Sequence, residues 1–500
     1  MRHVKNKYAI GAMLLVIFVI ATNIPGAQAA HSNSQRISGN PEPGWLDWKD
    51  PAISSNGDVT AVVYVRNNDT RNPNSVYRVW MKISVDSGST FLIPATQVSS
   101  EDITREQRHP DVTVVTMLDD GVEETEIFVT WQEKDSYGRW EVWVRNYTVD
   151  GSDILPTGIP EKISVYGGPY TESMYPRING SYIPDENDDD PATFVMLVFQ
   201  QGAGSSGRYT VKYSYMVHDA SDNPMDPCGW TTPNTPSGLE LNEENSFEHP
   251  SIDTFAYLRD DGPVEACTLF SIVCDEKNYD GPGTYRCCFW DGKLTISAHD
   301  YISPICETVT HFNSDSDEYG YPDCCIEFYD DLVREVVVWQ ADNDTAMAKS
   351  YTTLDTIALG PCKSSSMRGI SIDHIEQEYY SSATNSTRSN WTNPGGITVI
   401  WRSGEMNLST NETYGIDSIN LEHKGGNLRI SHDYWNDDDG NDDSDAGTDY
   451  DPVCVYHETN DPDDRYIDIS SIYPDESHVS YLKDQKEIWY FTLDDYLEKT

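Results

Sequence analysis

Basic residues are scarce in this chain of 500 residues. Lysine and arginine together number 34, against 83 aspartates and glutamates, so the formal net charge is −49. A surface of this sign repels nucleic-acid phosphates and anionic lipid headgroups, because bringing like charges together costs free energy. We therefore expect neither a nucleic-acid partner nor an anionic membrane surface as partner.

Helical periodicity and familiar catalytic motifs are also missing. No stretch repeats apolar residues at i, i+3 and i+4 between helix caps, so an all-β protein is predicted. The absence of HExxH, GxSxG and P-loop patterns leaves zincin, serine hydrolase and NTPase functions without support. The sequence contains no CxxC pair, which argues against zinc ribbons and thioredoxin-like redox sites.

The N-terminus carries an export signal. Arg2, Lys5 and Lys7 precede an apolar run over 8–24, and Ala27-Gln28-Ala29 offers the small residues that signal peptidase requires. We predict a cleaved signal peptide over 1–29, with an uncleaved anchor as the alternative. No later apolar run is long enough to span a bilayer. The mature chain, 30–500, is therefore expected to be secreted, extracellular or at the cell surface.

The ten cysteines suit an oxidising compartment. Nine lie between 228 and 362 and the tenth is Cys454, which suggests disulfides in the middle of the fold. Their connectivity stays open at this level. Cys287 and Cys288 are adjacent, as are Cys324 and Cys325, and neighbouring side chains on a strand point to opposite faces. We therefore expect each member of a pair to have a different partner.

A repeated segment organises the rest of the chain. Each unit opens with a polar or aromatic residue, a proline, any residue and then an apolar one. The openers are Asp50-Pro51-Ala52-Ile53, His109-Pro110-Asp111-Val112, Tyr175-Pro176-Arg177-Ile178, His249-Pro250-Ser251-Ile252 and Tyr321-Pro322-Asp323-Cys324. They stand about 60 to 75 residues apart, and β-branched or aromatic runs follow each one.

This spacing suits a blade of four strands with long loops. Two fainter units follow, and we predict a single β-propeller of about seven four-stranded blades, with six as the alternative. Acidic loops are expected as insertions at about 185–190 and 436–451. Arg36-Ile37-Ser38 resembles the last strand of a blade, so it could close the ring by pairing with the C-terminal segment.

One turn carries a family signature. Ser84-Val85-Asp86-Ser87-Gly88-Ser89-Thr90-Phe91 matches the Asp-box, S-x-D-x-G-x-T-[W/F], whose structural residues here are Ser84, Asp86, Gly88, Thr90 and Phe91. In such a turn the aspartate accepts hydrogen bonds from turn amides and the glycine takes a positive φ. The mature chain therefore resembles exported, sialidase-like BNR (Asp-box) β-propellers.

The resemblance implies a fold more firmly than an activity. Sialidases of this type carry an arginine triad, a tyrosine nucleophile with a glutamate, and an acid/base aspartate. No motif here places Arg177, Arg402 and Arg465 together, so we assign no catalytic residues. We expect a non-enzymatic binding or cell-surface interaction module for a glycan or protein. The alternative is a sialidase-like glycoside hydrolase or lyase with its site at the mouth of the central channel, and a structural envelope or matrix component is third.

Metal binding is assessed from acidic loops and histidines. The residues Asp437, Asp439, Asp442, Asp443 and Asp445 surround a glycine turn with hard oxygen ligands, which suits Ca²⁺, although the EF-hand register is not met. A salty habitat explains the acidity equally well. His109 and His249 share one opener position, and we interpret them as structural residues that bond a neighbouring blade rather than as metal ligands.

Eight N-x-[S/T] sequons complete the sequence-level sites. They are Asn68, Asn146, Asn179, Asn343, Asn385, Asn390, Asn407 and Asn411. Four of them cluster between 385 and 411, in a segment rich in serine, threonine and asparagine. This cluster predicts an exposed, glycosylated face if the host glycosylates exported proteins.

Overall fold

The structure is a computed structural model. It describes residues 35–38, 47–67, 71–72, 75–91, 95–99, 105–119, 122–165, 171–183, 192–203, 207–219, 229–236, 239, 245–259, 265–279, 285–297, 300–301, 305–316, 320–329, 332–341, 345–350, 356–361, 370–374, 397–406, 412–424, 427–431, 453–459, 467–473, 476–483 and 487–492. The predicted signal peptide over 1–29 and both predicted acidic loops lie outside these residues. Within them, no helix has the length and apolarity that crossing a membrane requires.

The described strands form seven antiparallel sheets that follow one another in chain order, here called blades 1 to 7. Blade 1 consists of β2 (Asp47–Asn56), β3 (Val59–Asn67), β4 (Tyr77–Ser84) and β5 (Thr96–Gln97). Blade 2 consists of β6 (Gln107–Asp119), β7 (Val122–Lys134), β8 (Trp140–Asp150) and β10 (Glu161–Lys162), with β9 (Asp153–Pro156) also on β8. Blade 3 consists of β11 (Thr171–Ile183), β12 (Ala192–Ala203) and β13 (Arg208–Asp219).

The second half of the ring has the same plan. Blade 4 consists of β14 (Asn245–Arg259), β15 (Glu265–Asn278), β16 (Tyr285–Ser297) and β17 (Asp300–Tyr301), with β18 (Ile305–Ser316) also on β16. Blade 5 consists of β19 (Asp323–Tyr329), β20 (Leu332–Ala341), β21 (Thr345–Ser350) and β22 (Thr356–Pro361). Blade 6 consists of β23 (Ile370–His374), β24 (Ile397–Met406), β25 (Glu412–Lys424) and β26 (Asn427–Ser431), with β27 (Val453–Thr459) also on β25. Blade 7 consists of β28 (Ile467–Tyr473), β29 (Glu476–Lys483), β30 (Glu487–Thr492) and β1.

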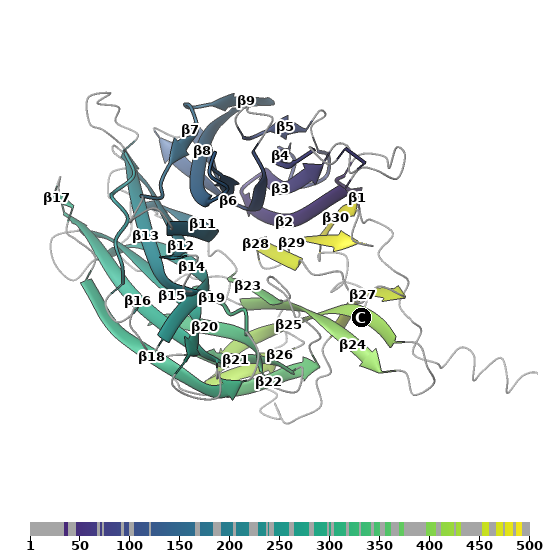
Figure 1. Cartoon of the computed structure of the whole chain (residues 1–500). Coiled ribbons are helices and arrows are strands. Elements are labelled where there is room, and N and C mark those ends of the chain that lie inside the picture. The colour runs from purple at the N-terminus through teal and green to yellow at the C-terminus, as the bar shows by residue number, and fades with distance from the viewer. Residues whose placement is uncertain are drawn as a thin grey trace, which may run out of the picture.

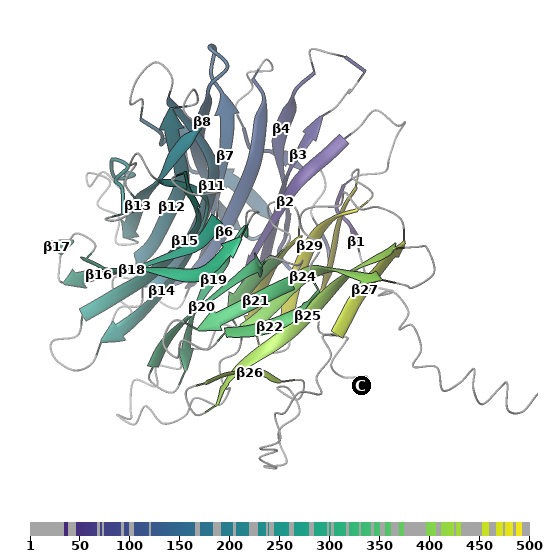
Figure 2. The same cartoon turned by 60° about the horizontal axis from the view of Figure 1, so that its bottom comes forward.

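The blades stand around a common axis as a propeller. The first strand of each blade contacts the first strand of the next, from β2 through β6, β11, β14, β19 and β23 to β28, and β28 contacts β2. Figure 1 shows the blades succeeding one another around the ring in chain colour, from purple to yellow, and Figure 2 shows the same ring tilted. The all-β propeller is therefore confirmed, with these first strands innermost.

The ring is closed by the N-terminal segment. β1 (Gln35–Arg36) pairs with β30, so that Gln35 lies opposite Tyr490 and Arg36 opposite Trp489. The peptide N–H groups of Ile37 and Ser38 continue this contact by donating to the carbonyl oxygen of Ile488, at 2.8 and 3.2 Å. The predicted closure by Arg36-Ile37-Ser38 is thus confirmed. Blade 7 is therefore completed by strands from the two ends of the described residues.

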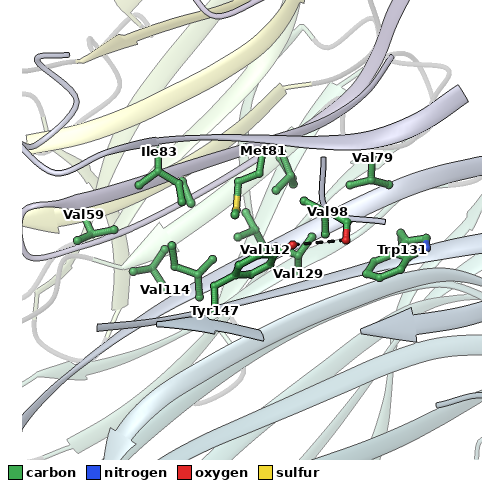
Figure 3. Packing of buried hydrophobic residues seen from close by; sticks show 14 of the residues in the cluster. Val59, Val79, Met81, Ile83, Val98, Val112, Val114, Val129, Trp131 and Tyr147 are labelled. Carbon is green, nitrogen blue, oxygen red and sulfur yellow. Dashed lines mark hydrogen bonds between the residues drawn. The ribbon is translucent and has the colours of Figure 1, made fainter. Parts of the chain in front are cut away.

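The blades are held together by apolar side chains between their faces. Between blades 1 and 2, Met81 and Ile83 pack against Val112, Val129 and other buried residues (Figure 3). Figure 3 also shows the hydrogen bond that the Tyr147 hydroxyl donates to the Val98 carbonyl, at 3.4 Å. Full burial of one such aliphatic side chain stabilises the fold by about 1.5 to 3 kcal/mol. A single sheet cannot bury both of its faces, so each blade depends on its neighbours.

The described cysteine side chains lie deep in this packing. Cys274, Cys288, Cys324 and Cys325 are all buried, and no disulfide is seen among the described residues. Cys324 packs between blades 4 and 5, whereas Cys325 packs in the core between blades 5 and 6. This adjacent pair therefore points to opposite faces, as predicted from the strand alternation. Disulfide formation itself remains a prediction.

Candidate functional site at the ring axis

The openers place five side chains in an unusual backbone conformation. The residue before each opener proline has a positive φ: 52° for Asp50, 47° for His109, 55° for Tyr175, 50° for His249 and 42° for Tyr321. Few residues other than glycine adopt such angles, and the following proline disfavours helical conformations further. In blades 1 to 4 the strand register shifts at this step, which marks a β-bulge. Bulges of this kind redirect a side chain out of its sheet.

The redirected aromatic rings form one continuous row, with tilted or edge-on contacts between neighbours. The ring centroids of His109 and Tyr175 lie 4.8 Å apart, those of Tyr175 and His249 lie 5.1 Å apart, and those of His249 and Tyr321 lie 4.6 Å apart. These four residues come from the innermost ends of blades 2, 3, 4 and 5, and we call them the axial girdle. Side chains from four successive blades can contact one another in a row only near the propeller axis, because the distance between neighbouring blades increases away from it.

Each girdle residue is held by an acceptor from the preceding blade. The peptide N–H of His109 donates to the Asp50 carboxylate at 3.1 Å. The N–H of Tyr175 donates to Gln132 near the end of β7 at 2.8 Å, and the N–H of His249 donates to Gln200 near the end of β12 at 2.9 Å. The N–H of Tyr321 donates to Asp275 near the end of β15 at 3.2 Å. These acceptors are at most 4% exposed. They offset the strain of the positive φ and fix the position of each ring.

The two histidine rings also contact carboxylates. His109 Nδ1 lies 3.6 Å from Asp50 Oδ2, and His249 Nδ1 lies 3.2 Å from Asp275 Oδ2. Both rings keep some exposure, at 18% and 10% of the side chain. The interpretation of these histidines as structural residues stays a prediction. Among the residues that the structure describes, no cluster of histidine, cysteine and acidic side chains suited to a metal ion is found.

Tyr175 lies at the centre of the girdle in a negative environment. Burial raises the pKa of the Tyr175 phenol, and the charges of Glu248 and Asp50 raise this pKa further. Glu248 is buried, and its Oε1 accepts a hydrogen bond from Ser246. The phenol of Tyr175 is therefore harder to ionise than an ordinary tyrosine.

Further along the innermost strands, buried acids bridge neighbouring blades. Four carboxylates accept from a peptide N–H of the next blade: Asp111 from Ile178 at 2.9 Å, Asp253 from Ile326 at 2.6 Å, Asp323 from Ile372 at 3.2 Å and Asp468 from Ile53 at 2.9 Å. The innermost strand is the free edge of its sheet, so its amides have no strand partner there. The acids satisfy these amides, which gives them a structural role.

One serine joins two of these carboxylates. Ser371 Oγ lies 3.0 Å from Asp323 Oδ2 and 3.2 Å from Asp468 Oδ1. The hydroxyl of Ser251 in blade 4 donates to the other oxygen of Asp323. Blades 4, 5, 6, 7 and 1 are thereby linked by one chain of hydrogen bonds near the axis.

The Asp-box residues lie in the turn after β4. Ser84 Oγ donates to Asp86 Oδ1 at 2.6 Å and accepts from the Gly88 N–H at 2.9 Å. Asp86 also accepts from the Thr90 N–H and hydroxyl, at 2.7 and 2.6 Å. Desolvation opposes ionisation, but the hydrogen bonds from Ser84 and Thr90 outweigh it and lower the pKa of Asp86. These bonds are the ones expected of a structural turn.

The last residues of the Asp-box contact blade 7. The ring of Phe91 stands edge-on to Tyr490, with 5.0 Å between centroids. Gly88 has φ +76°, and a Cβ at this position would stand 1.7 Å from the Tyr490 hydroxyl. That hydroxyl is in turn hydrogen-bonded to buried His478 Nδ1 at 2.5 Å. The turn therefore packs blade 1 onto the closing blade.

The remaining predicted site residues are mostly outside the described part. The acidic calcium candidates Asp437 to Asp445 are there, as are six sequons: Asn68, Asn343, Asn385, Asn390, Asn407 and Asn411. Asn146 is half-buried on β8. Asn179 lies on innermost β11, where its Oδ1 accepts from the Thr254 hydroxyl at 2.8 Å, so a glycan there would have to displace a contact between blades.

The arginines considered for a sialidase triad are not brought together by the described residues. Arg177 lies on β11 with its Nη1 3.7 Å from Asp111 Oδ1. Arg465 lies outside the described residues, and only the backbone of Arg402 is described, on β24. Sequence reasoning missed Gln132, Gln200 and Asp275 entirely. Their signal is a glutamine or aspartate that directly follows the apolar run of the second strand in each of these units.

Comparisons with known proteins give structural likeness only. No protein-family model matches the sequence, and no curated protein matches it. Among solved structures, a Trypanosoma rangeli sialidase in complex with sialic acid shares 8% identity at a TM-score of 0.38, over 94% of this chain and 60% of that one. A Penicillium chrysogenum alpha-L-arabinanase complexed with arabinobiose shares 11% identity at a TM-score of 0.42, over 74% of this chain and 93% of that one. The chain thus spans about 60% of the length of the sialidase, and no activity follows from these values.

Proposed function

We propose that this is an exported propeller that binds a glycan at the axial girdle. The observation that carries the proposal is the row of rings itself: four aromatic side chains from four blades, each held by a buried acceptor, converge at one end of the axis. A packed core has no need of five strained openers, and strain of this kind concentrates at binding and catalytic sites.

The chemistry of the girdle suits a carbohydrate. Ligand sites combine aromatic side chains with a few fixed polar groups, and sugars offer C–H surfaces to aromatic rings and hydroxyls to donors and acceptors. Here the polar groups are the Tyr175 phenol and the exposed edges of the histidine rings. The negative surroundings of Tyr175 favour neutral or amine-bearing sugars over sialic acid.

Glycoside hydrolysis is the second candidate. It is favoured by the position of the Tyr175 phenol beside the negative charges of Glu248 and Asp50, since some glycosidases use tyrosine as nucleophile. The raised pKa of Tyr175 works against this role, because a nucleophile needs a lowered pKa or an adjacent base that removes its proton. On this ground we place binding first.

Replacing Tyr175 by alanine is expected to weaken glycan binding by about tenfold or more, because truncation of a central aromatic side chain typically removes over 1 kcal/mol. Binding is measured by calorimetry against a panel of neutral, amine-bearing and sialylated oligosaccharides, with reducing-end release followed in parallel. Tyr137→Ala is the matched control, since Tyr137 is 83% exposed on the β7–β8 turn.

The outcomes separate the candidates. Binding without release of reducing ends, lost in Tyr175→Ala and kept in Tyr137→Ala, supports a binding module. Release that is abolished in Tyr175→Phe, which keeps the ring and removes the hydroxyl, supports hydrolysis. Equal binding by the wild type and Tyr175→Ala overturns the girdle as the site.

A further inference from the structure

Cys274 and Cys288 face each other on neighbouring strands. Cys274 on β15 is the direct antiparallel partner of Cys288 on β16. Their exposed fractions are 0% and 1%, and both belong to the apolar cluster between blades 3 and 4, with Phe270 and Ile272. The two side chains therefore share one face of blade 4.

This placement suits a covalent bond. Directly opposed residues of an antiparallel pair have Cα atoms about 4.5 or 5.5 Å apart, and disulfides span Cα separations of about 4.4 to 6.8 Å. Either spacing lies in that range, although the structure shows the two sulfurs without a bridge. We propose that Cys274 and Cys288 form an inter-strand disulfide in the mature, exported protein.

The bond forms by exchange with a disulfide of the oxidising compartment, either a small disulfide or a thiol–disulfide oxidoreductase. The thiolate of one cysteine attacks that disulfide and releases one thiol, and the second thiolate then displaces the other thiol. Two protons leave the cysteines, one S–S bond forms and the incoming disulfide is reduced. Exchange must precede the packing of blade 3 on blade 4, because afterwards both sulfurs are buried.

The bond would also support the axial girdle. Asp275 directly follows Cys274, and its carboxylate accepts from the N–H groups of Gly320 and Tyr321, at 2.9 and 3.2 Å, and contacts the ring of His249. A disulfide at Cys274 therefore fixes the strand end that holds two girdle residues. The reduced protein is expected to open more readily at this end of blade 4.

Peptide mapping tests the pairing in the full chain. Trypsin cleavage after Arg259, Lys277, Arg286 and Lys293 leaves Cys274 with Cys267 in one peptide, and Cys288 with Cys287 in another. The double variant Cys267→Ser/Cys287→Ser removes this ambiguity. After export through an oxidising compartment and alkylation without reductant, we expect the two peptides to be linked, two hydrogen masses below their sum. Because both sulfurs are buried in the folded protein, alkylation is done in denaturant without reductant, and alkylated Cys274 and Cys288 would then overturn the proposal.

Thermal melting gives a second readout that does not depend on glycan binding. The oxidised wild type is expected to melt a few degrees above the same protein after unfolding, reduction and refolding, because the bridge restricts the unfolded chain. Cys274→Ala/Cys288→Ala should show a smaller difference between its oxidised and reduced melting temperatures than the wild type, because reductant still breaks any other disulfides. Equal melting temperatures of oxidised and reduced wild type would contradict the bond, whereas failure of the glycan experiments would leave it untouched.

Discussion

Replacing Gly88 by alanine is expected to lower the free energy of unfolding by about 2 to 5 kcal/mol. A left-handed conformation costs a non-glycine residue about 1 to 2 kcal/mol, and overpacking adds about 1 to 3 kcal/mol. Gly88 has φ +76°, and its new Cβ would meet the Tyr490 hydroxyl at 1.7 Å. The tyrosine cannot swing aside cheaply, because it is 1% exposed and hydrogen-bonded to fully buried His478.

Gly151 provides the matched control for this experiment. It has φ +58° and nothing within 4 Å of a Cβ, so Gly151→Ala should show the conformational cost of about 1 to 2 kcal/mol without the clash. Both variants are compared with the wild type by denaturant unfolding. Equal losses would mean that blade 7 yields to the added methyl group, and the proposed packing of the Asp-box turn onto Tyr490 would then be wrong.

Asp468→Ala is expected to destabilise the protein by about 2 to 4 kcal/mol. Hydrogen bonds to a charged group contribute about 1.5 to 3 kcal/mol, and a buried amide left without an acceptor costs about 1 to 3 kcal/mol. Asp468 is 7% exposed, accepts from the Ile53 N–H at 2.9 Å and lies 3.2 Å from the Ser371 hydroxyl. Its loss weakens the contact of blade 7 with blade 1, where the ring closes.

Two further variants isolate this contact. Asp468→Asn keeps an acceptor for the Ile53 amide and should recover most of the loss, whereas Asp153→Ala removes an exposed aspartate on β9 and should change stability by less than about 0.5 kcal/mol. Denaturation midpoints of the three variants check this order. An Asp468→Ala protein as stable as Asp153→Ala would show that the axial carboxylates do not hold the blades together.

The repeat of the chain was visible in the sequence because proline and β-branched residues recur at fixed places. A proline lacks the N–H that a strand needs, so His109-Pro110 and its equivalents could be recognised as openers without any structure. Alternating apolar residues then predicted strands, and the turn residues after Ser84 predicted a structural loop. All these patterns involve residues that are close together in the sequence, so they can be recognised without a structure.

The girdle was not foreseeable in the same way. His109 and His249 were recognised at equivalent positions, but their contacts with Tyr175 depend on a positive φ that turns each side chain toward the axis. Gln132 and Gln200 were missed because a glutamine at a strand end carries no signal of its own. The role of each glutamine, which is to accept a hydrogen bond from a backbone N–H of the next blade, is seen only in the folded ring.

The amino-acid pattern thus dictated an acidic, all-β repeat with an Asp-box turn, because strand periodicity and turn chemistry depend on near neighbours in the chain. Three features depend instead on how the blades and their strands meet: the pairing of β1 with β30, the ring contacts of the axial girdle, and the position of Cys274 opposite Cys288. Asp468 and Ile53 stand 415 residues apart and meet because the ring closes. Such contacts form only when the last blade meets the first and the ring closes, and no single segment of the sequence determines how that happens.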